Sequence, residues 1–113
     1  MSHRIAQVNE LIRHELSQLI LKEIDFPKDC LVTITKVETT NDLEFARVWL
    51  SILPNNLQGK IFKIMQRNTG HLQYLLNKKL IMRKAPKINF IHDTTEEKAT
   101  RIDEILDKIQ HEV

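Results

Sequence analysis

The sequence is poor in the residues that build disulfide frameworks, nucleotide-binding loops and membrane spans. Its 113 residues include one cysteine, Cys30, and two glycines, Gly59 and Gly70. A single cysteine excludes an intrachain disulfide and a cysteine-based zinc site, and two glycines at this spacing form neither a P-loop nor a dinucleotide fingerprint. No apolar run approaches the roughly 20 residues that cross a bilayer, and the first residues lack the apolar segment of a secretory signal. We therefore expect a cytoplasmic protein.

Candidate catalytic residues are missing as well. Cys30 is far in sequence from any histidine that could activate it, so we expect a small packing residue. His92 and Asp93 are adjacent, and because neighbours in sequence rarely face each other, we expect Asp93 to begin a helix instead. The histidines stand singly, with no pair at metal-ligand spacing: His3, His14, His71, His92 and His111. The sequence predicts no enzyme, no metal site and no cofactor.

Acidic residues are absent from the middle of the chain. Positions 45–92 contain no Asp or Glu but nine Lys or Arg residues. Residues 1–44 hold five basic and eight acidic residues, and residues 93–113 hold three and seven. A basic segment between acidic flanks indicates a surface that binds a polyanion, with an acidic face that limits nonspecific binding. The alternative is a lysine-rich helix surface that only contacts solvent.

The first half of the chain predicts a helix and a β-hairpin. Apolar residues three and four apart predict an amphipathic helix over residues 4–24, which ends before Pro27. β-branched residues alternate over 31–37, and a second strand follows over 44–53. Its small aliphatic residues should face the helices, which leaves Arg47 and Trp49 on the far face. There Trp49 would either pack or, beside a cation, stack on a base.

The second half predicts a kinked pair of helices, a third strand and a last helix. Helical periodicity begins after Pro54, is interrupted at Asn68-Thr69-Gly70 and continues to Leu80. At the interruption we expect Gly70 to cap the first helix and Asn68 or Thr69 to cap the second. A third strand should cover 87–92. Thr94 and Glu97 have capping-box spacing, so a helix toward residue 111 should follow. No linker or repeat divides residues 1–113, and we expect one domain.

This order of elements resembles a type II K-homology (KH) domain, an α+β fold in which helices pack on one face of a three-stranded sheet. Ordinary KH domains clamp nucleic acid with a Gly-x-x-Gly loop between paired helices. Gly70 has no partner glycine at that spacing, so a kink replaces the loop here. The details resemble the ribosome-binding factor A family through an ordered set of motifs: Arg4-Ile5-Ala6, Val37-Glu38, Asp42-Leu43-x-x-Ala46-x-Val48, Gly70-x-Leu72-x-x-Leu75-Leu76, Leu80-x-Met82-Arg83-x-x-Pro86, Phe90 and Asp93.

The resemblance implies a bacterial assembly factor of the small ribosomal subunit. Such a factor binds small-subunit ribosomal RNA late in maturation, helps the terminal regions mature, and leaves before translation, without catalysing a reaction. The family usually has alanine at the position of Asn68 and often an arginine near Gln73. A protein-interaction module with an incidental basic face is the alternative function.

We expect RNA to contact the kink and the basic residues around it. Exposed backbone N–H groups near a helix terminus can bind phosphate, and Lys and Arg side chains neutralise it. Arg47 is left out, because it lies on the far face of the hairpin. The predicted RNA-binding residues are Lys60, Lys63, Arg67, Thr69, Gly70, His71, Lys78, Lys79, Arg83, Lys84 and Lys87. The expected partners are ribosomal RNA and immature 30S subunits, with the protein a monomer that binds neither a membrane nor a small molecule.

Overall fold

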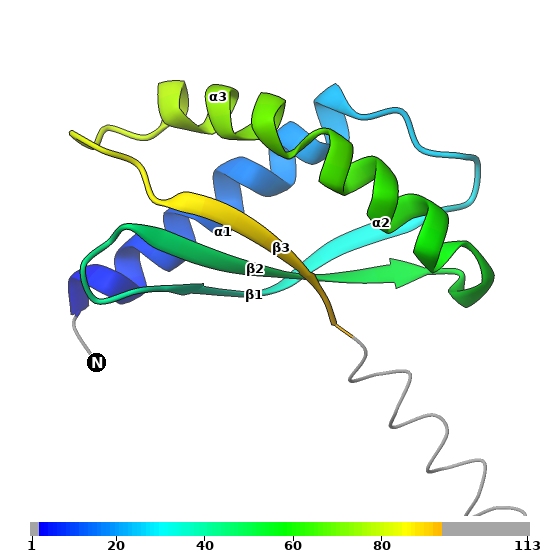
Figure 1. Ribbon diagram of the computed structural model, residues 1–113, viewed down its shortest axis with the longest axis horizontal. Coiled ribbons are helices and arrows are strands. Elements are labelled where there is room, and N and C mark those ends of the chain that lie inside the picture. The colour runs from blue at the N-terminus through cyan, green and yellow to red at the C-terminus, as the bar shows by residue number, and fades with distance from the viewer. Residues whose placement is uncertain (1–2, 94–113) are drawn as a thin grey trace, which may run out of the picture.

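Three helices lie against one face of a three-stranded sheet in the computed structural model, which describes residues 3–93 (Figure 1). The sheet order is β1-β2-β3, with β2 in the centre. The elements follow in the order α1 (His3–Glu23), β1 (Leu31–Thr39), β2 (Phe45–Leu53), the short 3₁₀ helix η1 (Asn55–Leu57), α2 (Gln58–Arg67), α3 (Thr69–Lys79) and β3 (Lys87–His92).

The long helix α1 forms because its apolar residues recur on one face. That face packs into the core, and its buried members are Ile5, Val8, Ile12, Leu16, Leu19 and Ile20. At the first turns, Asn9 Oδ1 accepts hydrogen bonds from the backbone N–H (2.9 Å) and the hydroxyl of Thr39, a buried polar residue. This contact satisfies polar groups at the end of β1 and fixes the helix against the hairpin.

The hairpin has one buried and one uncovered face. β1 and β2 pair antiparallel, with a register shift between Ile34 and Lys36 that leaves Thr35 as an extra residue. Along β2, Ala46, Val48 and Leu50 are fully buried while Phe45 and Arg47 are exposed. The alternation predicted for this strand is therefore confirmed, and the far face of the hairpin is the face that the helices leave open.

The break between α2 and α3 is a single residue. Asn68 leaves the helical region with φ −95° and ψ 1°, and α3 begins at Thr69. The side chains of Asn68 and Thr69 turn backward, donating hydrogen bonds to the carbonyls of Ile64 (2.8 Å) and Met65 (3.0 Å). The predicted kink is correct and no Gly-x-x-Gly loop is present. Asn68 occupies the N-cap position of α3, as predicted, but without a side-chain capping bond, and the predicted Gly70 cap is wrong. Gly70 has no positive φ and lies within α3, and neither polar side chain caps α3.

The third strand returns parallel to β2, because the helix pair carries the chain back across the sheet. The predicted strand over 87–92 is confirmed, and Ile88 and Phe90 are buried under the helices. The expected helix after Asp93, with its capping box, lies outside the described residues. Within them, Asp93 Oδ2 accepts a hydrogen bond of 2.6 Å from the Thr35 hydroxyl, and Cys30 is half-buried against the core.

Candidate nucleic-acid interface

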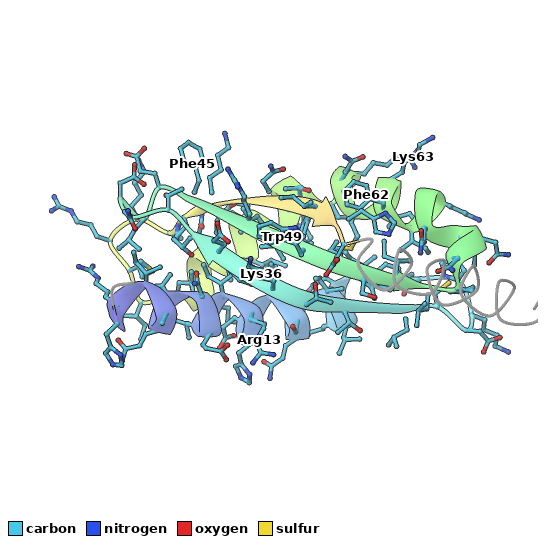
Figure 2. All side chains as sticks on the ribbon, turned by 90° about the horizontal axis from the view of Figure 1, so that it is seen from below. Arg13, Lys36, Phe45, Trp49, Phe62 and Lys63 are labelled. Carbon is cyan, nitrogen blue, oxygen red and sulfur yellow. The ribbon has the colours of Figure 1, made fainter. Side chains whose placement is uncertain are left out.

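Three of the predicted cations lie on the outer side of α2. Lys60, Lys63 and Arg67 are all exposed, while Ile61 and Met65 of the same helix are fully buried. Positions separated by three, four and seven residues share one helix face, so these three charges form one group. Figure 2 shows Lys63 at the outer edge of the molecule, beside Phe62.

The cations of α3 continue this group beyond the kink. Lys78 and Lys79 are exposed in the last turn, and the Lys78 ammonium lies 4.3 Å from the ring centroid of Tyr74. Tyr74 is itself a large exposed side chain. This aromatic residue was missed in the sequence, although its spacing of four residues from Lys78 is a signal for such a contact.

His71 is less available to RNA than the other predicted residues. Its Nε2 lies 3.6 Å from the Glu23 carboxylate at the end of α1. The acid-free segment therefore meets an acid that is distant in sequence, and a phosphate near His71 would have to compete with it. We keep His71 as a candidate, at the margin of the basic surface.

The segment between α3 and β3 forms a basic hollow. A cavity of about 450 Å³ is lined by Arg83, Lys84 and Lys87 together with polar and apolar neighbours, namely Gln73, Asn77, Met82 and Ala85. A second cavity of about 380 Å³ adjoins it. Arg4 of α1 lines it together with Arg83 and Lys84, and so do Asp42 and Glu44. Arg4 was not predicted, because nothing local in the sequence connects it to residues 83–84.

Asp42 carries a stable negative charge in the lining of this second cavity. The Thr40 hydroxyl donates a hydrogen bond to its carboxylate (2.6 Å), as does the Glu44 backbone N–H (3.1 Å). These bonds lower the pKa of Asp42 below its usual range, with a smaller contribution from the Lys84 charge. The basic hollow is therefore bordered by the carboxylate of Asp42, which stays ionised.

The kink presents backbone to solvent. Gly70 is exposed, and a Cβ built there would meet no atom within 4 Å. A ligand can therefore approach the first turn of α3 closely, as the phosphate hypothesis requires. Lys63 and Arg67 lie on the turn before the kink and Lys78 at the other end of α3, so cations stand on both sides of it.

Lys87 borders two surfaces. It lines the hollow with Arg83 and Lys84, yet it alternates with the buried Ile88 and so also belongs to the uncovered face of the sheet. The structure thus brings the α2 and α3 cations onto one helical layer, places Arg83 and Lys84 in the adjoining segment, and sets Lys87 at the sheet margin.

No metal-binding cluster and no membrane span is found in residues 3–93. Groups of three or more His, Cys, Asp or Glu residues that could hold a metal ion are absent from this range. None of its helices is both long and apolar enough to span a bilayer. Among its buried side-chain polar atoms, one, His92 Nε2, has no hydrogen-bond partner.

The fold and the surface together define a KH-like α+β domain that lacks the Gly-x-x-Gly loop. The sequence matches the family model described as "Ribosome-binding factor A" over residues 4–106. It is 36% identical to the ribosome-binding factor A of Desulforamulus reducens over 110 residues, which are 96% of this chain and 92% of the relative. With that of Coxiella burnetii (strain Dugway) it shares 32% over 108 residues, 96% and 91% of the two chains. The chain belongs to the ribosome-binding factor A family, whose members are named as binding factors, not enzymes.

Solved structures agree with the fold. The crystal structure of ribosome-binding factor A from Thermus thermophilus superimposes with a TM-score of 0.68 at 18% identity, covering 78% of this chain and 94% of that one. The solution structure of a Thermotoga maritima protein described as a putative ribosome binding factor A gives a TM-score of 0.58 at 27% identity, covering 80% and 84%. A T. thermophilus RbfA homology model fitted into a map of a 30S complex gives 0.64 at 19%, covering 83% and 96%.

Proposed function

We propose that this protein binds immature 30S subunits and their 16S ribosomal RNA late in maturation, and helps the terminal regions of that RNA to be processed and to fold. It dissociates before translation begins. Its action is binding, without a chemical step, in the cytoplasm and as a monomer. The T. thermophilus family member in the 30S complex supports the small subunit as the partner.

One observation carries this proposal. The outer side of the α2–α3 pair holds five exposed cations, Lys60, Lys63, Arg67, Lys78 and Lys79, on helices that contain no acidic residue. In the described part of the chain none of the five forms an ion pair with a carboxylate. Cations that are not paired with a carboxylate attract phosphates, whose bound counterions are released when the complex forms.

Co-sedimentation with immature and mature small subunits tests the proposal. The unmodified protein should sediment with immature subunits more than with mature ones, and the double variant K63E/R67E should lose most of this association. Lys28→Glu is the matched control, because Lys28 is exposed but lies in the loop before β1, outside the basic surface. Equal loss in the control, or equal binding by K63E/R67E, would contradict the assigned surface.

A protein-interaction module remains the competing function. It predicts that association with subunits depends on a ribosomal protein and is unaffected by removal of RNA charge contacts. Binding of protein-free 16S RNA, compared between the unmodified protein and K63E/R67E, separates the two functions. Weak binding of naked RNA together with full binding of subunits would favour the protein partner.

A further inference from the structure

The face of the sheet that no helix of residues 3–93 covers carries a row of two aromatic residues with a cation between them. Phe45, Arg47 and Trp49 alternate along β2 with residues that are fully buried. Phe45 is 52% exposed although it is a large apolar side chain. Figure 2 views this face and shows Phe45, Trp49 and Lys36 on it. Trp49 is half-buried, so the row offers one exposed and one partly exposed aromatic ring to a ligand.

The neighbouring strands place a cation beside each aromatic residue. Lys36 of β1 is paired with Trp49, and its ammonium lies 5.0 Å from the centroid of a Trp49 ring. Lys87 of β3 is paired with Phe45, and Arg47 lies between the two aromatics. Among the described residues Arg47 forms no ion pair. Phe45 therefore has two cations without an ion pair among the described residues, Arg47 and Lys87, next to it, whereas Lys36 beside Trp49 is paired with Glu38.

The carboxylates on this face are already engaged. Glu38 lies 3.2 Å from Lys36 in an ion pair, and Asp93 accepts the hydrogen bond from Thr35. The Phe45 end of the row, next to Arg47 and Lys87, thus keeps its positive charge. An anionic ligand with flat apolar groups complements this arrangement.

The spacing of the row selects an unpaired strand. Phe45 and Trp49 lie four residues apart along β2, which is a rise of about 13 Å. An unpaired strand can be stretched so that two of its bases reach two aromatic side chains this far apart and stack on them. In a duplex the bases stay stacked on one another and hide their faces from a protein. A duplex could therefore bind this row only through its phosphate charges, and no base could stack on Phe45 or Trp49.

We propose that the uncovered sheet face, around Phe45, Arg47 and Trp49, is a second RNA-binding surface that takes an unpaired RNA segment. This proposal rests on the proposed function, because it takes RNA as the ligand. The residues of this second surface lie on the opposite side of the sheet from the α2–α3 cations. One molecule can then hold structured RNA on its helices and a neighbouring single strand on its sheet.

Trp49 is the sole tryptophan of the chain, so its fluorescence reports on this surface alone. The full chain is titrated with a short single-stranded RNA and with an RNA hairpin of the same composition. A stacked base should quench Trp49, and the hairpin stem should not. Phe45→Leu keeps an apolar side chain but removes the aromatic face, and should weaken single-strand binding on the order of tenfold. Arg47→Gln should weaken it and reduce its salt dependence.

Lys28→Gln is the matched control, since Lys28 is exposed in the loop before β1, outside both surfaces, and its replacement should leave the Trp49 quenching unchanged. No quenching by the single strand, equal quenching by the hairpin, or quenching unaffected by Phe45→Leu and Arg47→Gln would overturn the proposal. Protection of Trp49 from acrylamide without RNA beyond that of a half-buried tryptophan would also overturn it. Such protection at every protein concentration assigns the face to residues 94–113, and protection that grows with concentration assigns it to a second copy.

The two proposals fail in different experiments. If the α2–α3 surface is misassigned, K63E/R67E still sediments with immature subunits while the single strand still quenches Trp49. If the sheet surface is misassigned, sedimentation depends on K63E/R67E as expected and the quenching is absent.

Discussion

Gln73 of α3 connects the helix to the first residues of β3 through both ends of its side-chain amide. Its Oε1 accepts a hydrogen bond of 2.7 Å from the Ile88 backbone N–H, and its Nε2 donates one of 3.0 Å to the Pro86 carbonyl. The same Nε2 also donates to Asn77 Oδ1 at 2.9 Å. This side chain therefore fixes the segment that carries Arg83, Lys84 and Lys87 against the helix pair.

Replacing Gln73 should destabilise the domain through the Ile88 contact. In Gln73→Ala the partly buried N–H of Ile88 and carbonyl of Pro86 lose their side-chain partner, which should cost about 1–2 kcal/mol in the free energy of unfolding. Urea denaturation with an unchanged m-value measures it.

Two further variants identify which bond matters. Gln73→Glu keeps the acceptor for Ile88 and should recover part of the loss. Gln73→Arg can donate to Pro86 but cannot accept from Ile88. It should remain less stable than Gln73→Glu; the reverse order would show that the Pro86 bond dominates.

The faces of the strands and helices could be predicted from the sequence, because periodicity is local information. The alternation at Ala46, Val48 and Leu50 needs no tertiary contact to be recognised. Gln73 could not be predicted as a connector, since its partners lie up to 15 residues away and use backbone atoms that carry no sequence signal. For the same reason Glu23 was not expected beside His71.

The position of the kink was predicted correctly, but the roles predicted for its side chains differ from those in the structure. Asn68-Thr69-Gly70 does interrupt the helix, but through side chains that bond backward to the preceding carbonyls. Whether such a side chain caps the next helix or bonds to the previous one depends on backbone angles that packing sets. For the candidate site, the sequence grouped Lys87 with the helical cations, and only the register of β3 placed it at the sheet margin.

Gly70 offers a test that separates stability from RNA binding. Because Gly70 has no positive φ and a Cβ there meets nothing within 4 Å, Gly70→Ala should raise the free energy of unfolding, by about 0.5 kcal/mol. If RNA backbone approaches the start of α3 closely, the added methyl group should nevertheless weaken binding to immature subunits.

Gly70→Val extends this test with a bulky β-branched side chain, which should weaken RNA binding further before it unfolds the domain. Thermal denaturation provides the stability and co-sedimentation the affinity. Gly59→Ala is the matched control, since Gly59 is also exposed and also meets no atom within 4 Å. Unchanged affinity in both Gly70 variants would count against a phosphate site at the kink.

Asp42 should contribute a pH-dependent part of the stability. Hydrogen bonds from Thr40 and the Glu44 N–H lower the pKa of its carboxyl in the folded state. A lowered pKa means that the unfolded chain takes up the proton first. The contribution is therefore complete above the usual Asp value of about 4 and is lost as the pH falls through the lower, folded value.

Denaturation from pH 7 down to pH 3 compares the unmodified protein with Asp42→Asn. The variant should be less stable at pH 7 and should show a shallower decline below about pH 4. Thr40→Val should reproduce part of the flattening, because it removes the largest cause of the lowered pKa. An equally steep decline in Asp42→Asn would assign the acid sensitivity to other carboxylates.

The salt dependence of binding to immature subunits should report how many phosphates the basic surface neutralises. If about five are neutralised, the slope of log affinity against log salt should be about −4, and each cation removed should reduce its magnitude by just under one. Lys63→Ala and Arg67→Ala should each show this reduction, because both side chains are exposed on α2. Lys28→Ala, equally exposed but in the loop before β1, should leave the slope unchanged. Lys87→Ala should reduce the magnitude of the slope only if the subunit also contacts the margin of the sheet, where Lys87 lies. A flat salt response of the unmodified protein would rule out phosphate contacts as the source of its affinity.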